Sequence, residues 1–141
     1  MPSQGTAQWK GDLKNGSGTF VAGTDITGSY SFKSRFEDGD GANPEQLIGA
    51  AHAACFSMAL SNALAEAGTP ADSIDAKSVV QLRIVDGAPA ITKIELSAVG
   101  KVPGVDDETF QAAAKDAKEN CPVSKALASV PEMTFEATLT A

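Results

Sequence analysis

The feature that most constrains this fold is the stretch Gln46–Ala65, twenty residues without a single Asp, Glu, Lys or Arg. Asn43 ahead of it is a good helix N-cap, and Pro44 suits the first helical position. Gly68 and Pro70 end the helix on the other side. A helix of roughly 23 residues is about 35 Å long, as long as a small domain is wide. Because it is apolar on nearly all sides, we expect it at the buried centre of the fold.

The same stretch is long enough to raise the question of a membrane span. Its many alanines and its polar side chains make it a weak membrane candidate, so we expect no membrane partner. If the helix is buried along its whole length, it needs cover from a second chain, and we therefore expect a homodimer. The polar side chains are those of Gln46, His52, Ser57, Ser61 and Asn62.

The residues on either side of this helix predict strands and shorter helices. Ahead of it, short strands are expected over residues 6–11 and 18–22, and a third over residues 28–36. After it, apolar and polar residues alternate, which is typical of half-buried strands. One domain spanning residues 1–141, in an α+β arrangement rather than a regularly alternating parallel sheet, fits this order. The later strands are expected around residues 80–84, 94–98 and 133–139, with a helix over about 106–119 and a short one from Cys121.

The charge balance excludes some partners. With 18 acidic and 11 basic residues the net charge is -7, which repels phosphate backbones, so we expect no nucleic-acid partner. The first residues hold no apolar stretch of the kind that a secretory signal needs, so the expected location is cytoplasmic. Thiols there are normally reduced, and two cysteines are then more often catalytic or metal-binding than a structural disulfide.

The two cysteines are therefore the first candidates for chemistry. Cys55 lies mid-helix, where an unreactive core cysteine would also lie. Cys121 precedes Pro122 and so lies at a helix start, where free amides stabilise a thiolate. A metal site is not expected, because two Cys and the single His52 do not complete a four-ligand set without carboxylates. His52 could tune the Cys55 thiol, although a lone His on an apolar helix is typically a packed core residue.

Arg35 and Glu45 are the candidate charges near the thiols, with solvated surface roles as the alternative. A thiolate in an apolar pocket needs a cation, which Arg35 could supply. Glu45 is ten residues before Cys55, about 15 Å along the helix axis, and so cannot touch the thiol within one chain. Antiparallel packing of two such helices would bring one chain's helix start nearer the other chain's cysteine. This hypothesis predicts an inactive monomer.

A recognisable pattern runs in order along nearly the whole chain. Its main segments are Asn43–Leu47, Ala50–Leu60 and Cys121–Leu127, joined by Trp9–Gly11, Arg35–Phe36, Ala90–Ile94 and Val102–Asp106. Together these segments resemble the OsmC/Ohr family of hydroperoxide reductases, closest to its osmotically inducible OsmC branch. The resemblance implies an OsmC-like α+β fold, an intertwined homodimer with antiparallel sheets around a long buried central helix, and a reaction without metal or organic cofactor.

The same resemblance implies the chemistry. Cys55 attacks the hydroperoxide and becomes a sulfenic acid, Cys121 forms a disulfide with it, and a dithiol or thiol reductant restores the pair. Arg35 and Glu45 assist, at positions usual for the OsmC branch; the Ohr branch carries its arginine earlier. Organic hydroperoxides are the expected preferred substrates in oxidative or osmotic stress defence, with hydrogen peroxide possible. The candidate apolar wall is Leu47, Ile48, Phe56 and Met58.

Three other functions share parts of this pattern. A redox sensor or thiol-storage protein would use the same cysteines without turnover. A binding module would use the long helix only as a dimer core. A serine or metal hydrolase fits least, since the chain has no G-x-S-x-G motif and no second histidine.

Overall fold

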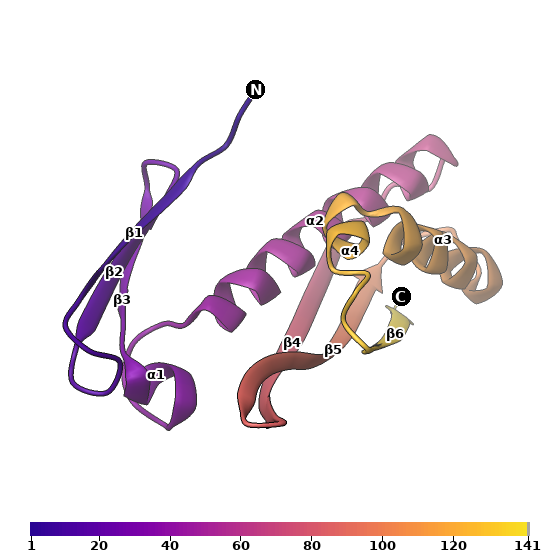
Figure 1. Cartoon of the computed structure of the whole chain (residues 1–141). Coiled ribbons are helices and arrows are strands. Elements are labelled where there is room, and N and C mark those ends of the chain that lie inside the picture. The colour runs from indigo at the N-terminus through magenta and orange to yellow at the C-terminus, as the bar shows by residue number, and fades with distance from the viewer. Residues whose placement is uncertain (141) are drawn as a thin grey trace. The chain divides into compact units, whose positions relative to one another are not determined.

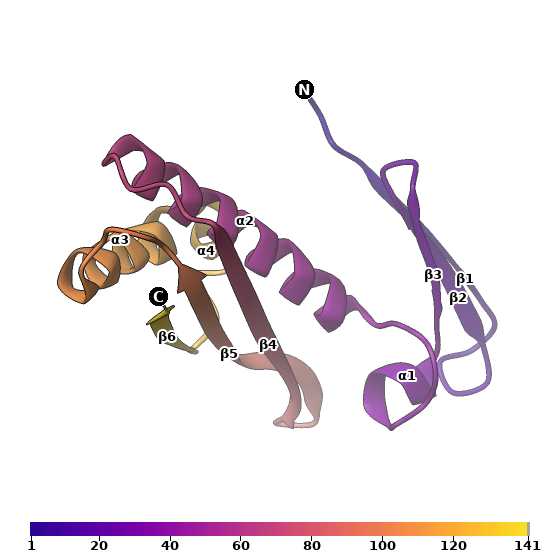
Figure 2. The same cartoon turned by 180° about the vertical axis from the view of Figure 1, so that it is seen from behind.

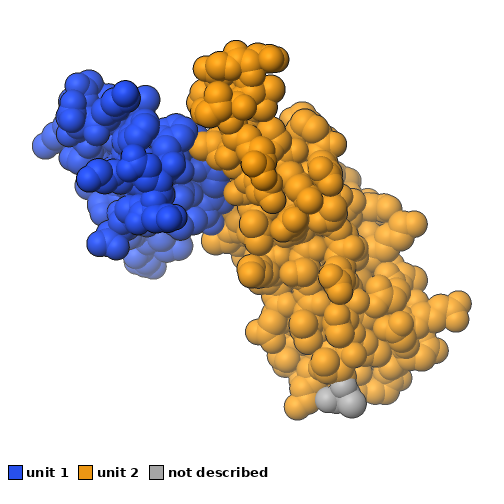
Figure 3. Space-filling model, turned by 90° about the horizontal axis from the view of Figure 1, so that it is seen from below, with its two compact units in different colours: residues 1–47 blue, residues 48–141 orange. Residues whose placement is uncertain are grey.

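The structure is a computed structural model that describes residues 1–140, and it confirms the α+β class (Figure 1). The chain forms two compact units, Met1–Leu47 and Ile48–Ala141 (Figure 3). Each unit contains a three-stranded sheet of its own.

The N-terminal unit is built on an antiparallel sheet in the order β1-β2-β3. The aromatic rings of its three strands cluster, with the Tyr30 centroid 5.3 Å from that of Trp9 and 6.3 Å from that of Phe20. The first two strands agree with the sequence prediction to within a residue. The strands are β1 (Gly5–Lys10), β2 (Ser17–Ala22) and β3 (Ile26–Tyr30).

The predicted third strand over residues 28–36 is wrong in its second half. The strand ends at Tyr30 and is followed by a short helix, α1 (Phe32–Phe36). Ser31 caps this helix by accepting from the Ser34 N–H at 3.1 Å, while the Ser31 N–H donates to the Ser34 hydroxyl at 2.8 Å. This reciprocal capping box satisfies the first amides of a helix and outweighs the strand-like run of aromatic residues.

The long helix is present as α2 (Pro44–Glu66). Its start matches the prediction, because the Asn43 side chain accepts a hydrogen bond from the Gln46 N–H at 2.8 Å. Beyond its end, Gly68 has φ +90°, a left-handed conformation that glycine adopts without steric cost.

Within one chain, α2 is buried on one face only. Phe56, Leu60 and Leu64 recur at every fourth residue and are at most 1% exposed. Met58 on another face is 75% exposed. The helix is long and apolar enough to cross a membrane by length and composition, yet only 28% of its most apolar window is buried. The expected burial on all sides is therefore not met within a single chain.

The C-terminal unit contains a mixed sheet in the order β4-β5-β6. β4 and β5 form a long antiparallel hairpin that turns at Asp86 and Gly87, both with positive φ. β6 pairs parallel to β5, which the expectation of antiparallel sheets did not include. A parallel partner needs a crossover connection, and two helices provide it. The elements are β4 (Ser73–Val85), β5 (Ala88–Lys101), α3 (Asp107–Asn120), α4 (Pro122–Ala126) and β6 (Glu132–Thr140).

The core of this unit lies between its helices and one face of the sheet (Figure 2). Alternate residues of β5 and β6 face it, as the sequence pattern predicted. Helix α2 comes very close to β4 at Gly49, where a Cβ would lie 2.7 Å from the Ser78 carbonyl oxygen. The core cluster consists of Phe56, Leu60, Leu64, Leu96, Ala98, Val102, Phe110, Ala114 and Ala117.

Candidate active site

The fold brings the two cysteines together within the C-terminal unit. Cys55 comes from the middle of α2, and Cys121 is both the C-cap of α3 and the N-cap of α4. Their Sγ atoms are hydrogen-bonded at 2.8 Å, and both cysteines are free thiols. Cys55 is half-buried, whereas Cys121 is fully buried. The prediction that Cys121 begins a helix with Pro122 in its first turn is confirmed.

The two thiols differ in acidity. Burial raises the pKa of Cys55 above its ordinary value of 9.0, and the hydrogen bond with Cys121 raises it further. Burial also acts to raise the pKa of Cys121, but hydrogen bonds from Cys55, from the amide and hydroxyl of Ser124 and from the Val123 amide lower it overall. These amides lie near the Cys121 sulfur, but the sulfur does not cap α4 with a side-chain hydrogen bond. Cys121 is therefore the more acidic of the two thiols.

His52 lies beside this pair and is fully buried. Its Nδ1 is 3.0 Å from the Ser78 hydroxyl on β4, and its Nε2 is 2.8 Å from the Ser124 hydroxyl on α4. Burial lowers the pKa of His52 below 6.5, and the charge of Lys118 lowers it further. The ring is therefore neutral at physiological pH.

In the N-terminal unit, Arg35 and Glu45 form an ion pair. Arg35 Nη2 lies 2.8 Å from Glu45 Oε1, and its Nε lies 3.2 and 3.3 Å from the two carboxylate oxygens. The Glu45 side chain is 7% exposed and that of Arg35 is 34% exposed. Such two-pronged contact fixes the orientation of the guanidinium as well as its position.

Ser34 and Asn43 hold the two ends of this ion pair in place. The Ser34 hydroxyl donates to the Ala42 carbonyl at 2.7 Å, and the Asn43 amide donates to the Ser34 carbonyl at 3.0 Å. These bonds tie α1 to the residues that begin α2. Arg35 follows Ser34 directly and Glu45 is two residues after Asn43, so the ion pair forms where these two segments meet.

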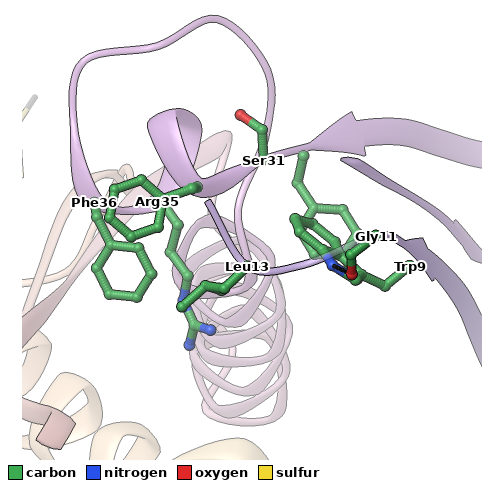
Figure 4. Close-up of a pocket in the computed structure, with 8 residues that line it drawn as sticks. Trp9, Gly11, Leu13, Ser31, Arg35 and Phe36 are labelled. Atoms are coloured by element: carbon green, nitrogen blue, oxygen red, sulfur yellow. Dashed lines mark hydrogen bonds between the residues drawn. The ribbon is translucent and has the colours of Figure 1, made fainter. Parts of the chain in front are cut away.

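A pocket of about 420 Å³ opens beside Arg35 in the same unit. Figure 4 shows Arg35 and Phe36 projecting from α1, with the Leu13 side chain beside Arg35. The Arg35 guanidinium carbon lies 5.6 Å from the centroid of the Phe36 ring. The pocket is thus mostly apolar, with one cation in its wall. It is lined by Trp9, Gly11, Leu13, Tyr30, Ser31, Phe32, Arg35 and Phe36.

The structure therefore brings the predicted site residues together in two pairs, Cys55 with Cys121 and Arg35 with Glu45. A role of Arg35 at the cysteines stays a prediction. Phe56 is a fully buried core residue, so it does not form a pocket wall within one chain. Among residues 1–140, no group of three or more His, Cys, Asp and Glu side chains is arranged to hold a metal ion.

Sequence reasoning missed Ser78 and Ser124 as partners of His52. Ser124 carries a usable signal, because it lies three residues after Cys121 just as Cys55 lies three after His52. Two helices that meet at one such pair are placed to meet at the other. Ser78 has no comparable signal, since its position depends on the close approach of α2 to β4.

Comparison with known proteins gives one consistent result. The sequence profile of the family described as OsmC-like protein matches residues 37–136. The Escherichia coli (strain K12) protein named peroxiredoxin OsmC is 50% identical over 126 residues, which are 88% of each chain.

Solved structures with low sequence identity support the same fold. An organic hydroperoxide resistance protein OsmC from Legionella pneumophila is 21% identical, with a TM-score of 0.71 and 96% of each chain covered. An OsmC-like protein from Mycoplasma pneumoniae is 17% identical, with a TM-score of 0.75 over 100% of this chain and 99% of the other.

Proposed function

The chain belongs to the family of OsmC-like proteins, and we propose that it is a cysteine-based peroxidase in which Cys55 attacks the hydroperoxide and Cys121 resolves the product. The observation that carries these roles is the 2.8 Å contact between the two sulfurs. An oxidised Cys55 then has the sulfur of its partner directly beside it.

The reaction has two steps at these sulfurs. The Cys55 thiolate attacks the outer peroxide oxygen, an S–O bond forms, the O–O bond breaks, and the leaving alkoxide takes a proton to become an alcohol. The Cys121 thiolate then attacks the sulfur of the Cys55 sulfenic acid, an S–S bond forms, the S–O bond breaks, and hydroxide leaves as water after protonation. A dithiol or thiol reduces the disulfide by exchange and is itself oxidised.

Arg35 supplies the cation that the first step needs. Burial and the contact with Cys121 raise the pKa of Cys55, so its thiolate requires stabilisation from elsewhere. In our proposal the Arg35 guanidinium provides it and also stabilises charge that develops on the peroxide oxygens. Glu45 holds that guanidinium in one orientation.

The functional form is a homodimer of single domains, each spanning residues 1–141. The support comes from α2, whose exposed face is made of small and apolar side chains. A second copy of this helix would cover that face and shield it from water. A cytoplasmic location belongs to the same proposal, because reducing thiols are maintained there. The exposed face includes Ala50, Ala54, Met58, Ser61 and Ala65.

Organic hydroperoxides are the favoured substrates. The pocket beside Arg35 is walled mainly by aromatic and aliphatic side chains, which would bind the organic group of an alkyl or aryl hydroperoxide. Hydrogen peroxide has no organic group, so contact with these side chains would not strengthen its binding.

Peroxide consumption with a dithiol reductant tests the function. Cumene hydroperoxide and hydrogen peroxide are compared with the native chain, Cys55→Ser and Cys121→Ser. We expect the native chain to turn over, to prefer cumene hydroperoxide, and to lose activity in Cys55→Ser. A native chain that forms one disulfide and then stops despite excess dithiol would indicate a sensor instead. A Cys55→Ser variant with full activity would overturn the assignment.

A further inference from the structure

Leu13 is an exposed leucine in the wall of the pocket beside Arg35. It lies in the turn between β1 and β2, and 59% of its surface is exposed. Figure 4 shows its side chain beside that of Arg35. Removing apolar surface from water is favourable, so a leucine exposed in a pocket wall offers binding energy to an apolar ligand. The mechanism above gives Leu13 no part.

The turn that carries Leu13 is held by hydrogen bonds from residues before and after it. The indole N–H of Trp9 donates to the carbonyl of Gly11 at 3.1 Å and to that of Asp12 at 3.3 Å. The Asp12 carboxylate accepts from the backbone N–H of Asn15 at 2.7 Å. A wall that is already formed loses little conformational entropy when a ligand binds, so contact with Leu13 strengthens binding.

The same wall contains one group that binds the polar end of a ligand. The ion pair with Glu45 occupies Nε and Nη2 of Arg35. Among residues 1–140, Nη1 of Arg35 donates to no protein atom, so it is available to a peroxide oxygen. An organic hydroperoxide has one polar end and one apolar end, and Arg35 and Leu13 match these two ends.

We propose that Leu13 is a specificity-determining residue: it covers the organic group of an alkyl or aryl hydroperoxide whose peroxide end lies at Arg35. The proposal deepens the function above and rests on it for the role of Arg35. Hydrogen peroxide makes the polar contact but not the apolar one. Leu13 therefore raises kcat/KM for organic hydroperoxides relative to that for hydrogen peroxide.

A second copy of the chain is the other occupant that could cover Leu13. The pocket favours a small molecule, because its volume of about 420 Å³ is in the range of small-molecule sites. The cation in its wall also needs a polar partner, which a hydroperoxide supplies.

A comparison of two peroxides tests the proposal. In Leu13→Ser, the ratio of kcat/KM for cumene hydroperoxide to that for hydrogen peroxide should fall roughly tenfold. Leu13→Met keeps an apolar side chain of similar size and should retain most of the ratio. Ile26→Ser is the matched control, because Ile26 is also 59% exposed and belongs to the same sheet but does not line the pocket. It should leave the ratio unchanged.

Trp9 provides a second measurement that needs no turnover. It is the single tryptophan of the chain and lines the pocket, so its fluorescence reports a bound ligand. The probe is 2-phenyl-2-propanol, the alcohol that reduction of cumene hydroperoxide releases. Its dissociation constant should rise roughly tenfold in Leu13→Ser and stay the same in Ile26→Ser.

The possible failures are distinct. A folded Leu13→Ser chain with the native ratio and the native dissociation constant would overturn the proposal, as would a native chain that does not bind the probe. A Leu13→Ser chain that sediments as a monomer, beside a dimeric native chain, would overturn it by assigning Leu13 to a contact between copies. A native chain that binds the probe but consumes neither peroxide would overturn the peroxidase function, and the role of Leu13 with it.

Discussion

The Sγ atoms of Cys55 and Cys121 lie 2.8 Å apart although 66 positions separate them in the sequence. One comes from a long apolar helix and the other from the junction of two later helices. The pair is asymmetric, because the pKa of Cys55 is raised and that of Cys121 is lowered. In the proposed reaction, the sulfur that must attack peroxide is thus the one that needs outside help.

Removing the resolving cysteine should separate the two chemical steps. In Cys121→Ser, one equivalent of cumene hydroperoxide should still oxidise Cys55, but no disulfide between these positions can form. The sulfenic acid should then be trapped by dimedone and, without trapping, proceed to sulfinic acid in excess peroxide. Mass spectrometry of the intact chain distinguishes these products. A Cys121→Ser chain that shows no oxidation at Cys55 would contradict the assigned order.

Loss of the Arg35 cation should shift the pH profile of the first step upward. Arg35→Met removes the proposed stabiliser of the Cys55 thiolate, so the rate of oxidation by peroxide should rise only at higher pH than in the native chain. The variant also leaves Glu45 buried without its partner, which should cost about 1–3 kcal/mol of unfolding free energy. Stopped-flow oxidation across pH and chemical denaturation measure the two effects.

Arg83→Met is the matched control for that variant. Arg83 is exposed and, among residues 1–140, its side chain is hydrogen-bonded to that of Gln81 alone. Its loss should therefore change stability by less than about 0.5 kcal/mol and leave the pH profile intact. Equal behaviour of the two variants would remove Arg35 from the mechanism.

A charge on the exposed face of α2 should disrupt assembly. Met58 is 75% exposed in one chain, and Met58→Glu would place a carboxylate where a second chain is proposed to pack. Sedimentation velocity should show the native chain as a dimer and this variant as a monomer with little peroxidase activity. Ala112→Glu on the exposed side of α3 provides the comparison, and it should remain dimeric. A native chain that sediments as a monomer would reject the dimer.

Acid should destabilise the fold through His52. Burial and Lys118 lower the pKa of His52 in the folded chain below 6.5, so near pH 6 the unfolded chain binds more protons than the folded one. At higher pH His52 is neutral in both states and does not affect stability. As the pH falls through the pKa of His52 in the unfolded chain toward its lower pKa in the folded chain, protonation of the unfolded chain lowers the free energy of unfolding. The unfolding midpoint of the native chain should fall more between about pH 7.5 and 5.5 than that of His52→Gln. An equal fall of the unfolding midpoint with pH in both chains would show that His52 does not cause the acid destabilisation.

Local sequence signals predicted most of the secondary structure. The Asn43 cap and the break at Gly68 fixed the limits of the long helix, and alternation located β6 correctly. Alternation carries no information on strand direction, which is why the parallel pairing of β5 and β6 was missed. The aromatic residues around Tyr30 favour a strand, but the capping box of Ser31 and Ser34 begins a helix there.

The candidate site was predictable only in part. Cys55, Cys121, Arg35 and Glu45 were named as candidates from the motifs that carry the family resemblance. The structure shows the contact between the two cysteines and the ion pair between Arg35 and Glu45. The hydrogen bonds of His52 were not predictable, since they depend on how closely α2 approaches β4 at Gly49. A long-range approach of this kind is set by packing and leaves no periodic trace in the sequence.

The crossover that delivers Cys121 also has a consequence for synthesis on the ribosome. Cys121 lies in the connection between β5 and β6, so it emerges well after Cys55. A nascent chain that has emerged only as far as Lys101 already exposes Cys55 but has no resolving partner. In the proposed reaction, a peroxide that oxidises Cys55 during that interval leaves a sulfenic acid with no internal thiol to resolve it, so that sulfur stays open to further oxidation.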